Sequence, residues 1–218
     1  MSKAFIFDLN GTIVDDMDCH TKGWRHVIND KLGGMMTYEQ LKSQMYGKNS
    51  EVLKRIFGEH YFTAFEIEHL SNAKEERYRQ EFLPRLALLP GLPEFLEKAK
   101  AKGIKMAVAS AAITANIDFV LDGLNIRHYF SAIVSADQVC QSKPHPETFL
   151  MAAMLLREKP ADCLVFEDAP KGAEAARNAG MKAIILTTTH QPVEFSHLEN
   201  IVGYGKDYTQ FDEQIFGA

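Results

Sequence analysis

The sequence predicts an α/β protein, in which a doubly wound, Rossmann-like parallel sheet carries a small inserted all-helical domain. Short apolar segments alternate with helix-like segments after residue 88, and this alternation is typical of βαβ units. One further strand-like segment precedes residue 10. Between the two parts, residues 16–82 are rich in charged side chains and show no convincing strand pattern, which indicates a helical insert.

The first strand is predicted from Lys3 to Leu9, an apolar run that the turn signal Asn10-Gly11-Thr12 ends. Further strands are predicted at 104–110, 132–135, 163–166 and 182–186. The last of them is continuously apolar, as expected of a strand buried on both faces of a sheet. Helices are predicted from residue 92 to Gly103, and at 114–121, 146–156 and 171–179.

The insert has its own helix signals. Thr37 and Gln40 are spaced as a capping box, which predicts that a helix begins there. We therefore expect two domains: a core of residues 1–15 and 83–218, and a helical domain of residues 16–82.

Composition excludes several classes of protein. The 218 residues carry a formal net charge of -5, which argues against a nucleic-acid partner. The three cysteines, Cys19, Cys140 and Cys163, are odd in number and lack metal-ligand spacing. No apolar run is long enough to span a bilayer, and a strand-like segment begins at once rather than a signal peptide. We expect a cytoplasmic protein without a membrane partner, and a monomer or weak dimer.

Chemically active side chains follow the predicted strands. Doubly wound sheets bind ligands beyond the C-terminal ends of their strands, so these side chains should converge. The four clusters are Asp8-Leu9-Asn10-Gly11-Thr12, Ser110-Ala111-Ala112, Ser142-Lys143-Pro144 and Glu167-Asp168.

This set suits phosphoryl transfer. The carboxylate of Asp8 can attack phosphorus and form an acyl phosphate. Mg²⁺ held by Asp8 and Asp168 would offset the repulsion between that carboxylate and a dianionic phosphate. Ser110 and nearby backbone N–H groups can hold phosphate oxygens, and Lys143 supplies a fixed positive charge.

In order and spacing the four clusters resemble the haloacid dehalogenase superfamily, and within it the β-phosphoglucomutase-like phosphatases and mutases. The family's first motif is Asp-x-Asp-Gly-Thr/Val, where this chain has Asp8-Leu9-Asn10-Gly11-Thr12. Its second is a Ser or Thr at a strand end, its third a Lys, and its fourth an acidic pair. Ser110, Lys143 and Glu167-Asp168 match them, and the resemblance covers essentially the whole chain.

The resemblance implies an aspartyl-phosphate intermediate on Asp8 and Mg²⁺ as the cofactor. The implied metal ligands are the carboxylates of Asp8, Glu167 and Asp168 and the backbone carbonyl of Asn10. Of two adjacent acids one often points away, so Glu167 is the weaker candidate. Ala111 follows the phosphate-binding Ser110 and is expected to contact substrate.

The resemblance also implies that the helical insert is a mobile cap that excludes water from the site. Four of its residues are expected to contact substrate: His20, Trp24, Lys48 and Lys74. Trp24 follows His20 by four residues, so both face one side of a helix, and Trp24 could equally be a core residue. Asn49 is a further candidate contact, and Asp15 is expected at a hinge.

Asn10 departs from the family pattern. The second Asp of the motif supplies a carbonyl to Mg²⁺ and a carboxyl group that protonates the leaving oxygen. Asn10 keeps the carbonyl, but its amide does not shuttle a proton near neutral pH. General acid–base help contributes roughly 10²- to 10⁴-fold in rate, or about 3 to 5 kcal/mol, most of all for sugar hydroxyl leaving groups.

The function favoured by the sequence is Mg²⁺-dependent hydrolysis of a small phosphorylated metabolite, such as a sugar phosphate. One alternative is a β-phosphoglucomutase-type mutase. Another is a phosphometabolite-binding protein whose turnover Asn10 impairs. A receiver domain also carries an acceptor Asp, a Ser/Thr and a Lys, but the helical insert after the first strand disfavours it.

Overall fold

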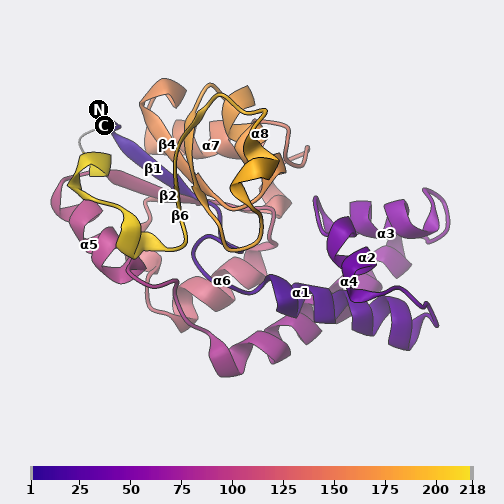
Figure 1. Cartoon of the computed structure of the whole chain (residues 1–218). Helices are drawn as coiled ribbons and strands as arrows, with labels where there is room; N and C mark the ends of the chain where they lie inside the picture. Colours follow the sequence, from indigo (N-terminus) through magenta and orange to yellow (C-terminus); the bar gives the residue numbers. More distant parts are fainter. Residues whose placement is uncertain (1, 217–218) are drawn as a thin grey trace. The chain divides into compact units, whose positions relative to one another are not determined.

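The computed structural model describes residues 2–216 and divides into two compact units (Figure 1). The core unit comprises residues 1–15 and 87–218, and the helical unit comprises residues 16–86. The boundary expected after residue 82 falls at the end of helix α4, and the short turn η2 (Leu83–Arg85) follows it.

A parallel sheet of six strands forms the core unit. Its strands are β1 (Ala4–Phe7), β2 (Lys105–Ala109), β3 (Ala132–Val134), β4 (Cys163–Glu167), β5 (Lys182–Leu186) and β6 (Ile201–Gly205). The order is β3-β2-β1-β4-β5-β6, and every neighbouring pair is parallel. The doubly wound α/β fold with a helical insert is therefore confirmed.

The position of β1 sets the place of the site. β1 pairs with β2 on one side and β4 on the other, so that Phe7 lies opposite both Val108 and Phe166. The strand order reverses here, and ligands of such sheets bind at this switch point, beyond the C-terminal ends of the strands. The residues that follow β1, β2 and β4 therefore come together at one edge.

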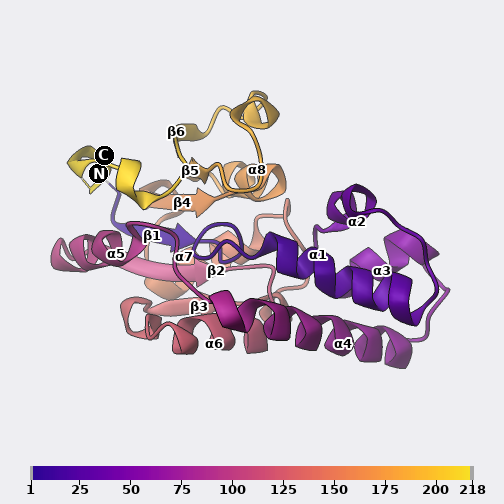
Figure 2. The same ribbon diagram turned by 60° about the horizontal axis from the view of Figure 1, so that its bottom comes forward.

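Four helices connect the strands of the core unit (Figure 2). They are α5 (Leu92–Ala101), α6 (Thr114–Gly123), α7 (Glu147–Leu156) and α8 (Pro170–Asn178). Helices α7 and α8 pack on one face of the sheet, where Phe149 and Ala176 share a core cluster with Ile6 and Val165. Helix α5 lies on the other face, and the right-handed crossover rule places α6 on that same side.

Aromatic rings fill the face that α5 covers. Phe95 of α5 stacks on Phe5 with 5.7 Å between ring centroids, and Phe7 stacks on Phe166 at 4.7 Å. Tyr208 joins them at 5.1 Å from Phe95. Phe7 and Phe166 immediately precede Asp8 and Glu167, so this packing anchors the strand ends that carry the site.

The helical unit consists of α1 (Met17–Arg25), the π-helical η1 (His26–Lys31), α2 (Tyr38–Gln44), α3 (Asn49–Phe57) and α4 (Ala64–Phe82). The capping box of Thr37 and Gln40 is confirmed at the start of α2. Gly23 lets α1 approach α4 closely, because a Cβ there would lie 2.9 Å from the carbonyl oxygen of Lys74. The remaining short turns are η3 (Arg127–Tyr129), η4 (Ala136–Gln138), η5 (Pro160–Asp162), η6 (Pro192–Phe195), η7 (Tyr208–Gln210) and η8 (Glu213–Phe216).

Strand β6 was not expected from the sequence. Its residues, Ile-Val-Gly-Tyr-Gly, include two glycines, which weaken a strand pattern. It forms the sheet edge with Val202 and Tyr204 exposed, so it lacks the continuous apolar run of the inner strands. No helix among the described residues is long and apolar enough to cross a membrane.

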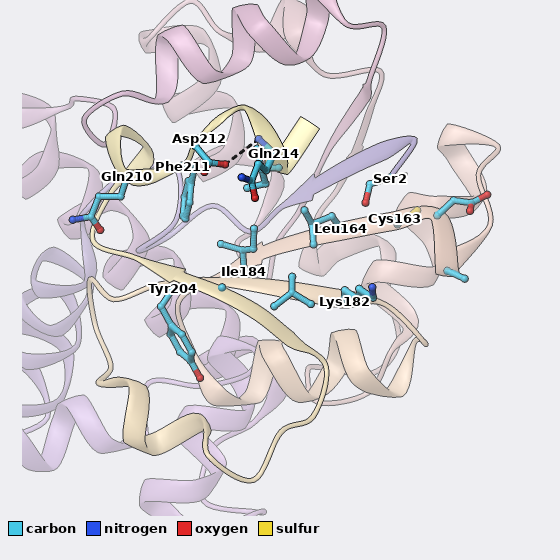
Figure 3. Close-up of a pocket in the computed structure, with 15 residues that line it drawn as sticks. Ser2, Cys163, Leu164, Lys182, Ile184, Tyr204, Gln210, Phe211, Asp212 and Gln214 are labelled. Atoms are coloured by element: carbon cyan, nitrogen blue, oxygen red, sulfur yellow. Dashed lines mark hydrogen bonds between the residues drawn. The ribbon is translucent and has the colours of Figure 1, made fainter. Parts of the chain in front are cut away.

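A cavity of about 400 Å³ lies beside β6 (Figure 3). Leu164, Lys182 and Ile184 line it together with Tyr204 and the segment 210–215. Leu164 and Lys182 lie at the beginning of β4 and β5, whereas the predicted site follows the ends of the strands. The cavity is therefore separate from that site.

We predict that Tyr208→Phe leaves the free energy of unfolding unchanged or raises it by up to about 1 kcal/mol, because the buried Tyr208 hydroxyl has no hydrogen-bond partner among the described residues. Tyr78→Phe is the matched comparison, since the Tyr78 hydroxyl donates to Asp16 Oδ2 at 2.6 Å, and its loss should cost about 1.5–3 kcal/mol. Urea unfolding of both variants measures this. A Tyr208→Phe variant as unstable as Tyr78→Phe would contradict it.

Candidate active site

Lys143 lies at the centre of the site. Its Nζ donates to Asp8 Oδ1 at 2.7 Å, to Glu167 Oε1 at 2.8 Å and to the carbonyl oxygen of Ala109 at 3.2 Å. An ammonium group has three protons, so these contacts use all of them and fix its position. Burial alone would lower the pKa of Lys143, but Asp8 and Glu167 hold it above its usual value. Lys143 therefore stays charged.

Asp8 follows β1 and is 7% exposed. Its N–H donates to the carbonyl oxygen of Phe166 at 2.9 Å, which continues the ladder between β1 and β4. Burial raises the pKa of Asp8 to about 6, with Lys143 opposing the shift and Glu167 adding to it. The carboxyl group is therefore mainly ionised at neutral pH.

Glu167 and Asp168 point in different directions. Glu167 Oε1 accepts from Lys143, and its Oε2 accepts from the N–H groups of Asp168 and Ala169, each at 2.8 Å. Glu167 is thus held as the partner of Lys143. Asp168 Oδ2 accepts from the hydroxyl of Thr189. Burial, and then the charges of Glu167 and Asp8, raise the pKa of Asp168 well above its usual value.

Ser110 and Ala111 present donors at the end of β2. Ser110 is buried, and its Oγ accepts from the N–H of Ala112 at 3.1 Å. That bond uses a lone pair and leaves the hydroxyl proton free to be donated. The N–H of the exposed Ala111 has no acceptor among the described residues. Together they can bind two oxygens of a phosphate.

The loop that carries Asn10 is closely folded. Gly11 has φ +72°, and a Cβ there would lie 2.2 Å from Asp168 Oδ2. Glycine is therefore required both by the left-handed backbone and by the closeness of the carboxylate. The N–H of Gly11 donates to the carbonyl oxygen of Val14 at 2.7 Å.

The donor set fits a divalent cation. Asp8, Glu167 and Asp168 are all buried, and one carboxylate oxygen of each lies within 4.8 Å of the others. Three carboxylates face one ammonium group, and the raised pKa values of Asp8 and Asp168 show that Lys143 does not balance them. Oxygen ligands with excess negative charge are those that Mg²⁺ prefers.

The predicted substrate residues of the helical unit form part of a buried polar network. Lys74 Nζ donates to His20 Nδ1 at 2.7 Å and to Glu75 Oε1 at 2.9 Å. Asn49 donates to the same Glu75 oxygen at 2.6 Å. Burial alone would raise the pKa of Glu75, but Lys74 above all lowers it to about 2. An ammonium group can only donate, so His20 Nδ1 is an acceptor.

Trp24 and Lys48 lie differently. Trp24 is 2% exposed in the apolar cluster of the helical unit, which favours the core role that the sequence left open. Lys48 is half-buried and precedes α3. Asp15 is exposed at the last position of the first core segment. Substrate contacts by His20, Trp24, Lys48 and Lys74 stay predictions.

The sequence did not single out Glu75 or Thr189 as partners of site residues. Glu75 lies among several charged residues on α4, and its partners are Lys74 of the same helix and Asn49 of α3. Thr189 follows β5 by three residues, and strand-end position was the one signal that could have indicated it.

The chain matches the family model described as haloacid dehalogenase-like hydrolase over residues 5–186. The fructose-1-phosphate phosphatase YqaB of Escherichia coli is 34% identical over 181 residues, which cover 83% of this chain and 94% of that protein. The β-phosphoglucomutase of Bacillus subtilis is 34% identical over 198 residues, which cover 84% and 82%. The crystal structure of β-phosphoglucomutase from Clostridium difficile has a TM-score of 0.86 and 26% identity, and the match covers 100% of this chain and 96% of that one.

The chain therefore belongs to the haloacid dehalogenase-like hydrolases and, within them, to the β-phosphoglucomutase-like group, as its resemblance predicted.

We predict that Mg²⁺ binds more weakly as the pH falls below about 6. The pKa of Asp8 is raised from 3.8 to about 6, so the metal must displace a proton at lower pH. Because this folded pKa lies above the unfolded value of 3.8, protonated Asp8 stabilises the metal-free folded chain below about pH 4. This stabilisation is lost as the pH rises through 6. Calorimetric Mg²⁺ titrations at pH 5 and 7.5 measure the affinity. Equal affinities at both pH values would contradict the prediction.

We predict that Glu75→Gln lowers the free energy of unfolding by roughly 3–5 kcal/mol, because it leaves Lys74 buried without a carboxylate partner. Glu76→Gln is the control, since Glu76 is the next residue of the same helix but is exposed. The folded pKa of Glu75 lies below the unfolded value of 4.5, so its contribution is present above pH 4.5 and is lost as the pH falls toward 2. Similar urea midpoints for the two variants would contradict this.

Proposed function

We propose that this protein is a Mg²⁺-dependent phosphatase that hydrolyses a small phosphorylated sugar through an aspartyl-phosphate intermediate on Asp8. The observation that carries the proposal is the buried cluster in which Asp8 and Glu167 contact Lys143 and Asp168 lies beside these two carboxylates. Unpaired buried charge is costly, and a bound divalent cation would offset this excess of negative charge.

Asp8 is the attacking group, because it ends β1 at the switch point of the sheet and its pKa leaves it ionised at neutral pH. Asp8, Asp168 and the carbonyl of Asn10 would hold Mg²⁺, with Glu167 beside them. When bound, the cation offsets the repulsion between carboxylate and phosphate.

The other residues hold the phosphate. Ser110 Oγ and the N–H of Ala111 can each donate to a phosphoryl oxygen, and Lys143 places a positive charge beside Asp8. These donors are fixed before substrate arrives: Lys143 by its three acceptors and Ser110 by the Ala112 amide. Fixed donors in a buried site stabilise developing charge without reorganisation.

The substrate class rests on relatives. YqaB is named as a fructose-1-phosphate phosphatase and the Bacillus subtilis relative as a β-phosphoglucomutase, and both names denote chemistry on sugar phosphates. We therefore propose a sugar phosphate, without assigning which one. In this scheme His20, Lys48 and Lys74 contribute to its recognition, whereas the burial of Trp24 in the apolar cluster favours a core role for that residue.

Asn10 limits the chemistry. An amide cannot protonate the sugar oxygen as it leaves phosphorus, and it cannot activate water for the second step. The mutase alternative requires such help in both half-reactions, so Asn10 disfavours it more than it disfavours hydrolysis.

We predict that Asn10→Asp raises kcat/KM for sugar phosphates by roughly 10²-fold or more, because it supplies the missing proton carrier. An aryl phosphate, whose leaving group departs as a stable anion, should gain far less. Phosphate release with and without Mg²⁺ measures both, and Asp8→Asn is the inactive control. If neither this chain nor its Asn10→Asp variant releases phosphate from a panel of metabolites, the proposed function is wrong.

A turnover-impaired binding protein is the second candidate, and Asn10 is the observation that favours it. An intermediate that forms on Asp8 but lacks a group to activate water would persist. Acid quench after addition of a reactive phosphodonor would then trap phosphate on Asp8. Rapid steady-state release of phosphate by the unmodified chain would rule this candidate out.

A further inference from the structure

Three consecutive threonines, Thr187, Thr188 and Thr189, follow β5, and two of them contact the candidate site. Thr188 Oγ1 donates to the carbonyl oxygen of Gly11 at 2.5 Å. Thr189 Oγ1 donates to Asp168 Oδ2 and lies 3.2 Å from the carbonyl oxygen of the same residue. Neither threonine belongs to the four clusters that carry the family resemblance.

Thr189 sets the orientation of the Asp168 carboxylate. Asp168 is 4% exposed, and its Oδ2 lies between the Thr189 hydroxyl and the backbone of Gly11. This bond fixes the carboxylate, one oxygen of which lies within 4.8 Å of a carboxylate oxygen of Asp8 and of Glu167. A hydroxyl also has two lone pairs, and Thr189 Oγ1 lies 2.9 Å from His190 Nδ1, which can hold the hydroxyl in place.

Thr188 restrains the loop that contains Asn10 and Gly11. The Asn10–Gly11 peptide is planar, so the bond from the Gly11 N–H to Val14 fixes the direction of the Asn10 carbonyl as well. Thr188 holds the carbonyl on the other side of Gly11. Gly11 is thereby restrained through both of its peptide groups, although its left-handed backbone would otherwise be free to move.

We propose that Thr188 and Thr189 are positioning residues of the cation site, which hold the Asn10 carbonyl and the Asp168 carboxylate for Mg²⁺. This inference rests on the proposed metal-dependent function. Partners that orient metal ligands commonly change affinity by about 10- to 100-fold when they are removed. Because both hydroxyls come from the segment after β5, the site depends on a strand that contributes no ligand of its own.

Thr187 provides a matched control. It has the same side chain in the same run, but its hydroxyl faces the carbonyl oxygen of Gly205 at 3.4 Å, on β6. Valine replaces threonine with nearly the same shape and no hydroxyl. Thr187→Val and Thr188→Val therefore each remove one hydrogen bond, whereas Thr189→Val removes the bond to Asp168 together with the contact to His190. Thr189→Ser restores the hydroxyl.

The test is calorimetric titration of the metal-free full-length chain with Mg²⁺ at pH 7.5. We expect Thr189→Val to weaken binding by about 10-fold or more, Thr188→Val to weaken it less, and Thr187→Val and Thr189→Ser to bind as the unmodified chain does. In EDTA, Thr189→Val and Thr187→Val should unfold at the same temperature, which separates a lost ligand orientation from a general loss of structure.

Two outcomes would overturn the inference in distinguishable ways. If the unmodified chain binds Mg²⁺ and Thr189→Val binds it equally well, the threonines do not position the ligands, and the proposed function is unaffected. If the unmodified chain does not bind Mg²⁺ at all, the cation site itself is wrong, and the inference fails together with the proposed function.

Discussion

The pairing of β1 between β2 and β4 is the constraint on which the site depends. Parallel strands end at the same edge of a sheet, and Phe7 lies opposite Val108 and Phe166 in register. A shift by one residue would turn Asp8 toward the opposite face. The aromatic packing of Phe5, Phe7 and Phe166 opposes such a shift, because it fills the face beneath these strand ends.

The buried charges at this edge of the sheet destabilise the folded chain. Buried charges are stable only when they are paired and hydrogen-bonded. Here Lys143 contacts two carboxylates, and a third, that of Asp168, lies beside them. Burial first, and then repulsion from neighbouring carboxylates, raises the pKa of Asp8 and of Asp168. Clusters of this kind occur where a ligand supplies the missing charge, and the excess of buried carboxylates here fits a cation.

The helical unit shows the opposite balance with similar components. Lys74 is buried beside one principal carboxylate, that of Glu75, and the pKa of Glu75 falls to about 2. Asp8 also contacts a buried lysine at hydrogen-bond distance, yet its pKa rises to about 6. At Glu75, Lys74 together with His20 and Asn49 outweighs burial, whereas at Asp8 burial and the charge of Glu167 outweigh Lys143. Glu75 accepts hydrogen bonds from Lys74 and Asn49. Asp8 shares its partner, Lys143, with Glu167.

The sequence by itself determined the alternation of strands and helices, the helical insert and the four clusters at strand ends, since all of these follow from local patterns and from the geometry of parallel sheets. The edge strand β6 was not predicted, because its glycines and exposed residues leave no periodic pattern of apolar residues. Only the tertiary structure decided that Glu167 is held by Lys143, that Asp168 is turned toward Thr189, and that Trp24 lies in a core. The physical reason is that these depend on contacts between segments far apart in the chain, which spacing along the sequence does not encode.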